Sequence, residues 1–161
     1  MSKSQSIATT ATDPTVAAAA AQFLSPLVHG LQALVVNGKQ AHWHVRGANF
    51  IGVHEFLDTV VANAMAFADS AAERIVALGL PIDARLGTIA DKIEPTQVSA
   101  GFSASEDTIR AVIADIDAVL VDVKAAIDGL DEIDLTSQDI AIEIMRGLEK
   151  DRWFLVSHVA V

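Results

Sequence analysis

Histidines and a carboxylate gather in one short stretch, KQAHWHVRGANFIGVHEFLD, which covers residues 39–58. It holds three of the five histidines, His42, His44 and His54, and ends on Asp58. His54 and Asp58 are four residues apart, so on a helix they share one face, one turn apart. Imidazole and carboxylate together form a ligand set suited to iron or zinc. A solvated surface carboxylate and a core histidine fit the same spacing, which by itself leaves metal binding open.

A second pair, Asp69 and Glu73, follows on the same predicted helix with the same four-residue spacing. Asp69 comes eleven residues after Asp58, so the two pairs lie on nearly one stripe, roughly 16 Å apart. One metal ion cannot bind both pairs of a single chain, because ligand bonds are about 2 Å long. Either each pair works separately, or a two-fold related subunit brings its acidic pair against the His54–Asp58 pair. His42, at the end of the preceding helix, would complete such a cluster.

Two long helices are predicted to carry these residues, because apolar side chains recur there at helical spacing. Asp13 is a good N-cap for the first helix, and Pro14 suits its first position. Pro26 lies inside the helix and predicts a bend, not an end. The second helix is expected over residues 50–78, with Asn49 as its cap.

Two further long helices are expected in the second half of the chain, after a long connection with a short helix near Ile89. Ser103 and Glu106 have the spacing of a capping box at the start of the third helix. Thr136 or Ser137 opens the fourth. Four long helices with one long crossover between the second and third match an all-α, ferritin-like four-helix bundle. No strand-like alternation is present, so no sheet is expected.

Composition limits the classes of protein that this chain can represent. The 161 residues suit one domain, which we expect over residues 13–161 behind a flexible N-terminal tail at 1–12. Zero cysteines exclude disulfides, thiolate metal sites and a cysteine nucleophile. The net charge of −10 attracts cations and repels nucleic acid. No uninterrupted apolar run of about 18 residues occurs, so we expect no membrane span and a cytoplasmic location.

The block from residue 39 to residue 75 resembles the ferroxidase signature of the Dps family, the DNA-binding proteins from starved cells, also called mini-ferritins. The resemblance lies in the stretch quoted above followed by DSAAERI at residues 69–75. It implies that the iron ligands come from two subunits related by a two-fold axis. These ligands are His42, His54 and Asp58 of one subunit, with Asp69 and Glu73 of its partner.

The resemblance also implies an activity and an assembly. It implies a ferroxidase, an enzyme that oxidises Fe²⁺ with hydrogen peroxide or O₂, and a hollow homo-dodecamer that stores the ferric oxide and limits oxidative damage. Trp43 would be an oxidisable neighbour of the site, although a core aromatic is an equally good reading of it. Asp134 and Asp139 are candidates for a carboxylate ring in the hydrophilic pores on the three-fold axes, where negative potential would attract Fe²⁺.

Two other functions fit parts of the pattern. A metal-dependent hydrolase could use the same inter-subunit site with zinc or manganese, since a metal-bound water can be activated for hydrolysis. The second alternative function is that of a structural shell that associates with DNA. DNA affinity depends on neutralising phosphates, and the first twelve residues contain one basic residue, Lys3. We therefore expect weak DNA binding or none.

Overall fold

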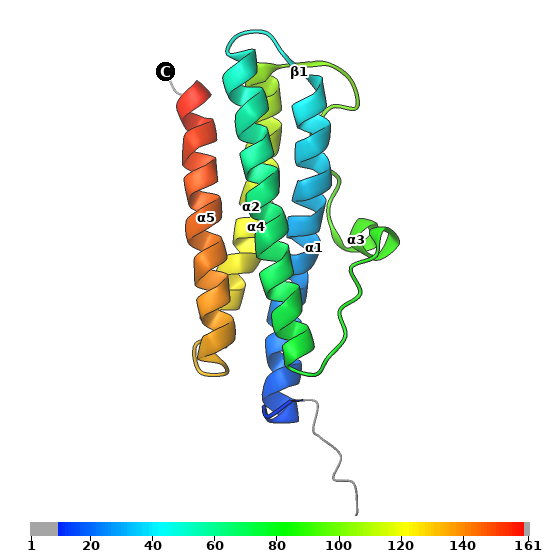
Figure 1. The fold of residues 1–161 in the computed structure, drawn as a ribbon, viewed down its shortest axis with the longest axis vertical. Coiled ribbons are helices and arrows are strands. Elements are labelled where there is room, and N and C mark those ends of the chain that lie inside the picture. The colour runs from blue at the N-terminus through cyan, green and yellow to red at the C-terminus, as the bar shows by residue number, and fades with distance from the viewer. Residues whose placement is uncertain (1–9, 160–161) are drawn as a thin grey trace, which may run out of the picture.

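The chain folds into a bundle of four long helices, seen side by side in Figure 1. The structure is a computed structural model and describes residues 10–159, so most of the predicted tail at 1–12 lies outside the described residues. A short helix, α3, lies beside α1 on the long connection between the second and third long helices, which confirms the predicted all-helical, ferritin-like arrangement. The helices are α1 (Pro14–His44), α2 (Phe50–Ala77), α3 (Leu86–Lys92), α4 (Ser105–Leu130) and α5 (Leu135–Val159).

Helix α1 begins and continues as the sequence predicts. The Asp13 carboxylate accepts hydrogen bonds from the backbone N–H groups of Thr15 at 2.8 Å and Val16 at 3.4 Å, which satisfies two donors at the helix start. Pro14 occupies the first turn, and Pro26 lies inside the helix without ending it. The helix therefore reaches His44 unbroken.

The two other predicted helix caps have different outcomes. Asn49 occupies the N-cap position of α2 as predicted, but it has the left-handed backbone conformation, with φ of 56°, and its side chain makes no capping hydrogen bond. Helix α4 begins at Ser105, and Ser103 does not cap it. Glu106 instead binds Arg110 at 2.6 Å, one turn along the helix surface. The predicted capping box fails because Ser103 already belongs to a strand.

That strand is part of a two-residue parallel pair, which the sequence did not predict. β1 (Val45–Arg46) pairs with β2 (Ser103–Ala104). The Arg46 guanidinium lies 3.5 Å from the centre of the Phe102 ring and covers the same junction. Segments of two residues are too short to show alternation, so only the fold reveals them. The pair ties the α1–α2 turn to the start of α4.

The core is aliphatic, and close packing of the helices depends on glycines at several contacts, two of which face aromatic rings. A Cβ at Gly147 in α5 would collide with the ring of Phe67 in α2, and one at Gly129 would collide with Phe23. Among the described residues, α1 and α2 are long and apolar enough to cross a bilayer, a test that core helices also pass. Their apolar faces here form the core, whose largest fully buried side chains include Leu24, Leu27, Leu31, Leu34, Leu57 and Ile75.

Among the described residues, one carboxylate is buried in this core. Asp151 of α5 is 2% exposed, and the side-chain amide of Asn63 in α2 donates to both of its oxygens at 3.0 and 2.9 Å. Burial raises the pKa of Asp151 above its ordinary value, and the bonds from Asn63 only partly oppose this. At neutral pH the ionised carboxylate of Asp151 therefore lowers the free energy of unfolding of the bundle.

We predict that Asp151→Asn stabilises the protein increasingly as pH rises from about 4 to 7. A raised folded-state pKa stabilises the fold below the ordinary aspartate value of about 3.9, and this stabilisation is lost as pH rises through the raised value. The Asp151→Asn variant has no carboxyl group at this position to titrate, so its stability does not fall in this way as pH rises. Denaturant unfolding at fixed protein concentration measures the difference. The control is Asp128→Asn, an exposed residue bound to Lys124, which should show little trend. A difference for Asp151→Asn that is constant with pH would contradict the assignment.

Candidate metal centre

Two histidines from different helices form the centre of the site. His42 lies in the last turn of α1 and His54 near the start of α2, and the turn between the helices brings them together. Their rings are stacked, with centroids 3.7 Å apart and an angle of 21° between the planes. His42 is buried, at 7% exposed, and His54 is half-buried.

The two imidazoles hold each other in place through the backbone. His42 Nδ1 donates to the carbonyl of His54 at 2.7 Å, and His54 Nδ1 donates to the carbonyl of His42 at 2.9 Å. A ring nitrogen that donates to a carbonyl carries the proton, so Nε2 of each neutral ring keeps a free lone pair. This is how metal-binding histidines are oriented in proteins. Both rings are therefore prepared to act as ligands.

Asp58 completes the group one turn after His54. Its carboxylate is half exposed, and its Oδ1 lies 2.6 Å from Lys39 Nζ and 3.3 Å from His42 Nδ1. The hydrogen bond from Lys39 lowers the pKa of Asp58 below its ordinary value and outweighs the effect of partial burial. The carboxylate is therefore ionised at neutral pH. Sequence analysis did not single out Lys39, although its place three residues before His42 puts it on the same helical face.

The acidic pair does not join this group within one chain. Asp69 and Glu73 are exposed further along α2, which is unbroken, so the eleven-residue offset from Asp58 is retained. Within residues 10–159, no group of three or more histidine, cysteine or acidic side chains is placed to hold a metal ion. His42, His54 and Asp58 are thus brought together, and the chain by itself offers only part of a metal site.

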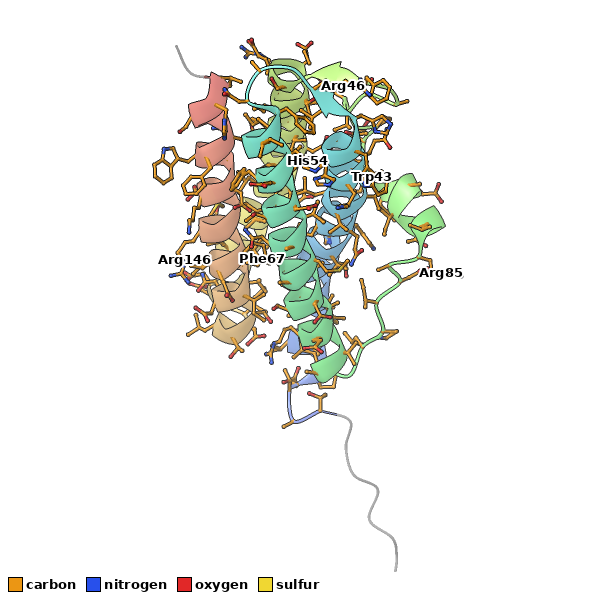
Figure 2. The ribbon with its side chains drawn as sticks, turned by 45° about the horizontal axis from the view of Figure 1, so that its top comes forward. Trp43, Arg46, His54, Phe67, Arg85 and Arg146 are labelled. Carbon is orange, nitrogen blue, oxygen red and sulfur yellow. The ribbon has the colours of Figure 1, made fainter. Side chains whose placement is uncertain are left out.

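Aromatic side chains flank the two histidines. The Phe50 ring stacks on His54 with centroids 5.1 Å apart, a contact that sequence analysis missed. Trp43 of α1 lies at the same end of the bundle as His54 (Figure 2) and is 63% exposed. Lys39 Nζ lies 5.9 Å from the centre of its indole ring. The reading of Trp43 as a core aromatic is therefore wrong for the single chain.

The two pore candidates differ in their surroundings. Asp134 accepts from Arg74 Nη2 at 2.7 Å and from the Ser137 hydroxyl, which fixes the α4–α5 turn against α2. Burial tends to raise the pKa of Asp134, but these hydrogen bonds outweigh it and the pKa is lowered. Asp139 is exposed on α5. The side chain of Asp139 therefore faces solvent, whereas Asp134 is paired with Arg74.

Comparison with known proteins identifies the family. The model of the ferritin-like domain matches residues 21–161. A structure of Dps from Microbacterium arborescens in the high iron form is 68% identical, covers 93% of this chain and 98% of its own, and superposes with a TM-score of 0.91. The chain belongs to the Dps family of ferritin-like proteins.

More distant Dps proteins are similar over most of the fold. A tetragonal form of Dps from Mycobacterium smegmatis is 31% identical, with a TM-score of 0.86 over 92% of this chain and 91% of that one. The DNA protection during starvation protein of Mycolicibacterium smegmatis is 37% identical over 125 residues. That match takes in 75% of this chain and 66% of the relative, so the chain spans slightly less than two thirds of it.

We predict that Lys39→Gln tightens Fe²⁺ binding by up to about fivefold, the modest effect expected of an exposed ion pair. The lysine must release Asp58 before a metal ion can use both oxygens. Anaerobic titration with Fe²⁺ measures the affinity. Lys124→Gln removes the exposed partner of Asp128 and serves as the matched control. Weaker binding by Lys39→Gln would show that the lysine supports the site and does not compete with the metal.

Proposed function

We propose that this chain is an iron-storing mini-ferritin of the cytoplasm. In this proposal it oxidises Fe²⁺ with hydrogen peroxide or O₂ at sites between subunits of a homo-dodecamer, stores ferric oxide inside the shell, and limits oxidative damage. Membership of the Dps family supports an iron-storing, stress-protective role, because the family is known for ferroxidase activity. The observation that carries the proposal is the stacked pair of histidines, His42 and His54, with both Nε2 atoms free beside the ionised Asp58.

The side chains of the site suit iron in both oxidation states. Imidazole nitrogen binds Fe²⁺ well, and carboxylate oxygens offset the charge that the ion gains on oxidation to Fe³⁺. Two Fe²⁺ ions supply one electron each to hydrogen peroxide, whose O–O bond breaks, and two protons complete the formation of two water molecules. A site that delivers both electrons together avoids the hydroxyl radical that a single electron transfer would release. Two ions need more ligands than His42, His54 and Asp58 can provide.

The missing ligands are proposed to come from a second copy of the chain. Asp58, Met65, Asp69, Glu73 and Val76 follow one another on α2 at spacings of three, four or seven residues, so they form one stripe. All five are exposed in the single chain, including Met65 at 47% and Val76 at 59%. Large apolar side chains in such a row mark an interaction surface.

A two-fold axis near the middle of this stripe would make the contact reciprocal. The axis places Asp69 and Glu73 of each subunit opposite His54 and Asp58 of the other, because a residue pair made once by a two-fold axis is made twice. Each dimer then has two complete sites. The exposed stripe and the incomplete site within one chain support the same arrangement.

Mixing two inactive variants tests the shared site directly. We predict that His54→Ala/Asp58→Ala and Asp69→Ala/Glu73→Ala each lose rapid Fe²⁺ oxidation, while large apolar interfaces keep the assembly. Co-assembly after joint refolding restores roughly a quarter of the parent number of sites, since half of the dimers are mixed and each mixed dimer has one intact site. Stopped-flow absorbance under peroxide measures the rate, and light scattering confirms the mass.

The alternative arrangements give different results in the same experiment. No recovery in the mixture would show that the two pairs do not meet across subunits. Full activity of either variant alone would remove its residues from the site. The control is a mixture of each variant with itself, refolded in the same way, which should stay inactive.

Fe²⁺ must also cross the shell, and a ring of acidic side chains on a three-fold axis is the proposed route. We predict that Asp139→Asn slows iron uptake, most clearly at low ionic strength, because the attraction of a charged ring is screened by salt. Asp134→Asn also breaks the bond to Arg74, so a stability measurement must accompany it. Uptake is followed by the growth of ferric absorbance under conditions where oxidation alone is fast. If both variants take up iron at the parent rate, neither residue lines the route.

Charge argues against DNA as the principal partner. The net charge of −10 per chain repels phosphate, and neutralisation of phosphates by basic side chains supplies most of the affinity for DNA. We therefore propose that DNA binding is weak or absent, and that iron chemistry is the main activity of this chain.

A further inference from the structure

A cavity of about 220 Å³ lies between α1 and α4, where the connection after α3 passes over them. The histidines and carboxylates of the candidate metal centre take no part in its lining. Its floor is apolar and is lined by Gly30, Ala33 and Leu34 of α1 with Ala118 and Val119 of α4. An apolar floor of this kind suits a ligand with an aliphatic body.

One carboxylate on the wall is held in a fixed orientation. Asp115 Oδ2 accepts from Asn37 Nδ2 of α1 at 3.0 Å and from the Thr96 hydroxyl at 2.7 Å. Its other oxygen, Oδ1, makes no hydrogen bond to any part of residues 10–159. Burial raises the pKa of Asp115 and outweighs both hydrogen bonds. Oδ1 is therefore a positioned and partly desolvated acceptor, which a charged donor would stabilise.

A second carboxylate lines the same cavity two helical turns further on. Asp122 is half-buried, and burial raises its pKa. Neither Asp115 nor Asp122 has a basic partner among the ion pairs of the described chain. Lys92 and Glu94 also line the cavity, so three carboxylates and one ammonium group belong to its lining. Desolvated negative charge of this kind favours a bound cation.

The spacing of the two aspartates defines the shape of that cation. Seven residues of helix separate their Cα atoms by about 10.5 Å. With charge-assisted hydrogen bonds of about 2.8 Å at each end, two ammonium groups would lie roughly 5–10 Å apart. The side chains of Ala118 and Val119 lie between the two aspartates along α4 and offer contact to methylene groups.

We propose that this cavity binds a short linear aliphatic diamine, with one ammonium group on Asp115 and the other on Asp122. The proposal is independent of iron oxidation. A divalent metal ion suits the cavity less well, because residues 10–159 contain no group of three metal-ligating side chains arranged to hold one. The volume is also smaller than the 300–1,000 Å³ or so of pockets that accept larger organic ligands.

Calorimetric titration of the assembled protein with 1,4-diaminobutane at low ionic strength tests the site. We expect saturable binding of one molecule per chain, and at least tenfold weaker binding of 1-aminobutane. Asp115→Asn and Asp122→Asn should each weaken diamine binding at least tenfold. Asp128→Asn makes the same change of charge on an exposed part of α4 and should bind like the parent. Iron oxidation should stay at the parent rate in all three variants.

A variant that fills the cavity separates this site from general attraction to an acidic surface. Ala118→Leu adds volume on the floor without a change of charge, so it should abolish diamine binding while the helical content is kept. Parent-like binding by Ala118→Leu, or equal losses in Asp128→Asn and Asp122→Asn, would overturn the proposal. So would Mg²⁺ displacing the diamine at equal concentration, or no saturable binding to the parent protein.

Discussion

The two hydrogen bonds that His42 and His54 exchange through their backbone carbonyls are the constraint on which the site depends. They join the end of α1 to the start of α2 and fix both rings with Nε2 free. A ring that is held in this way loses little rotamer freedom when it binds a metal, so less of the binding energy goes into ordering. The turn between the helices must therefore be rigid, and the β1–β2 pair ties it to the start of α4.

The two faces of α2 carry different kinds of side chain. One face is buried through Val53, Leu57, Val60 and Ala64 and holds the bundle together. The other carries acidic and apolar side chains in one row and has no covering element within residues 10–159. An exposed row of this kind is typical of an interaction surface. In the proposed assembly, a second copy of the chain would cover this row and complete the iron site.

Two other carboxylates in the bundle, Asp151 and Asp115, differ in whether a cation can reach them. Within residues 10–159, Asp151 faces α2 with only Asn63 as a hydrogen-bond donor, and Asp115 has two donors on one oxygen and none on the other. Burial raises the pKa of both. Asp151 is enclosed by protein, so the free-energy cost of burying its charge only lowers the stability of the fold. Asp115 borders a cavity, where a cation can offset the cost, and this difference in access separates a structural carboxylate from a candidate binding group.

The sequence by itself determined the helices and predicted the candidate ligands, because periodicity, Asp13 with Pro14, and the spacing of His54, Asp58, Asp69 and Glu73 are local properties of the chain. It predicted the capping box at Ser103 wrongly, since Ser103 belongs to a two-residue strand pair. Only the tertiary structure decided which ring nitrogens are free, that Lys39 holds Asp58, and that Trp43 is exposed. These depend on contacts between α1 and α2, and no spacing along one helix specifies how a second helix is rotated against it.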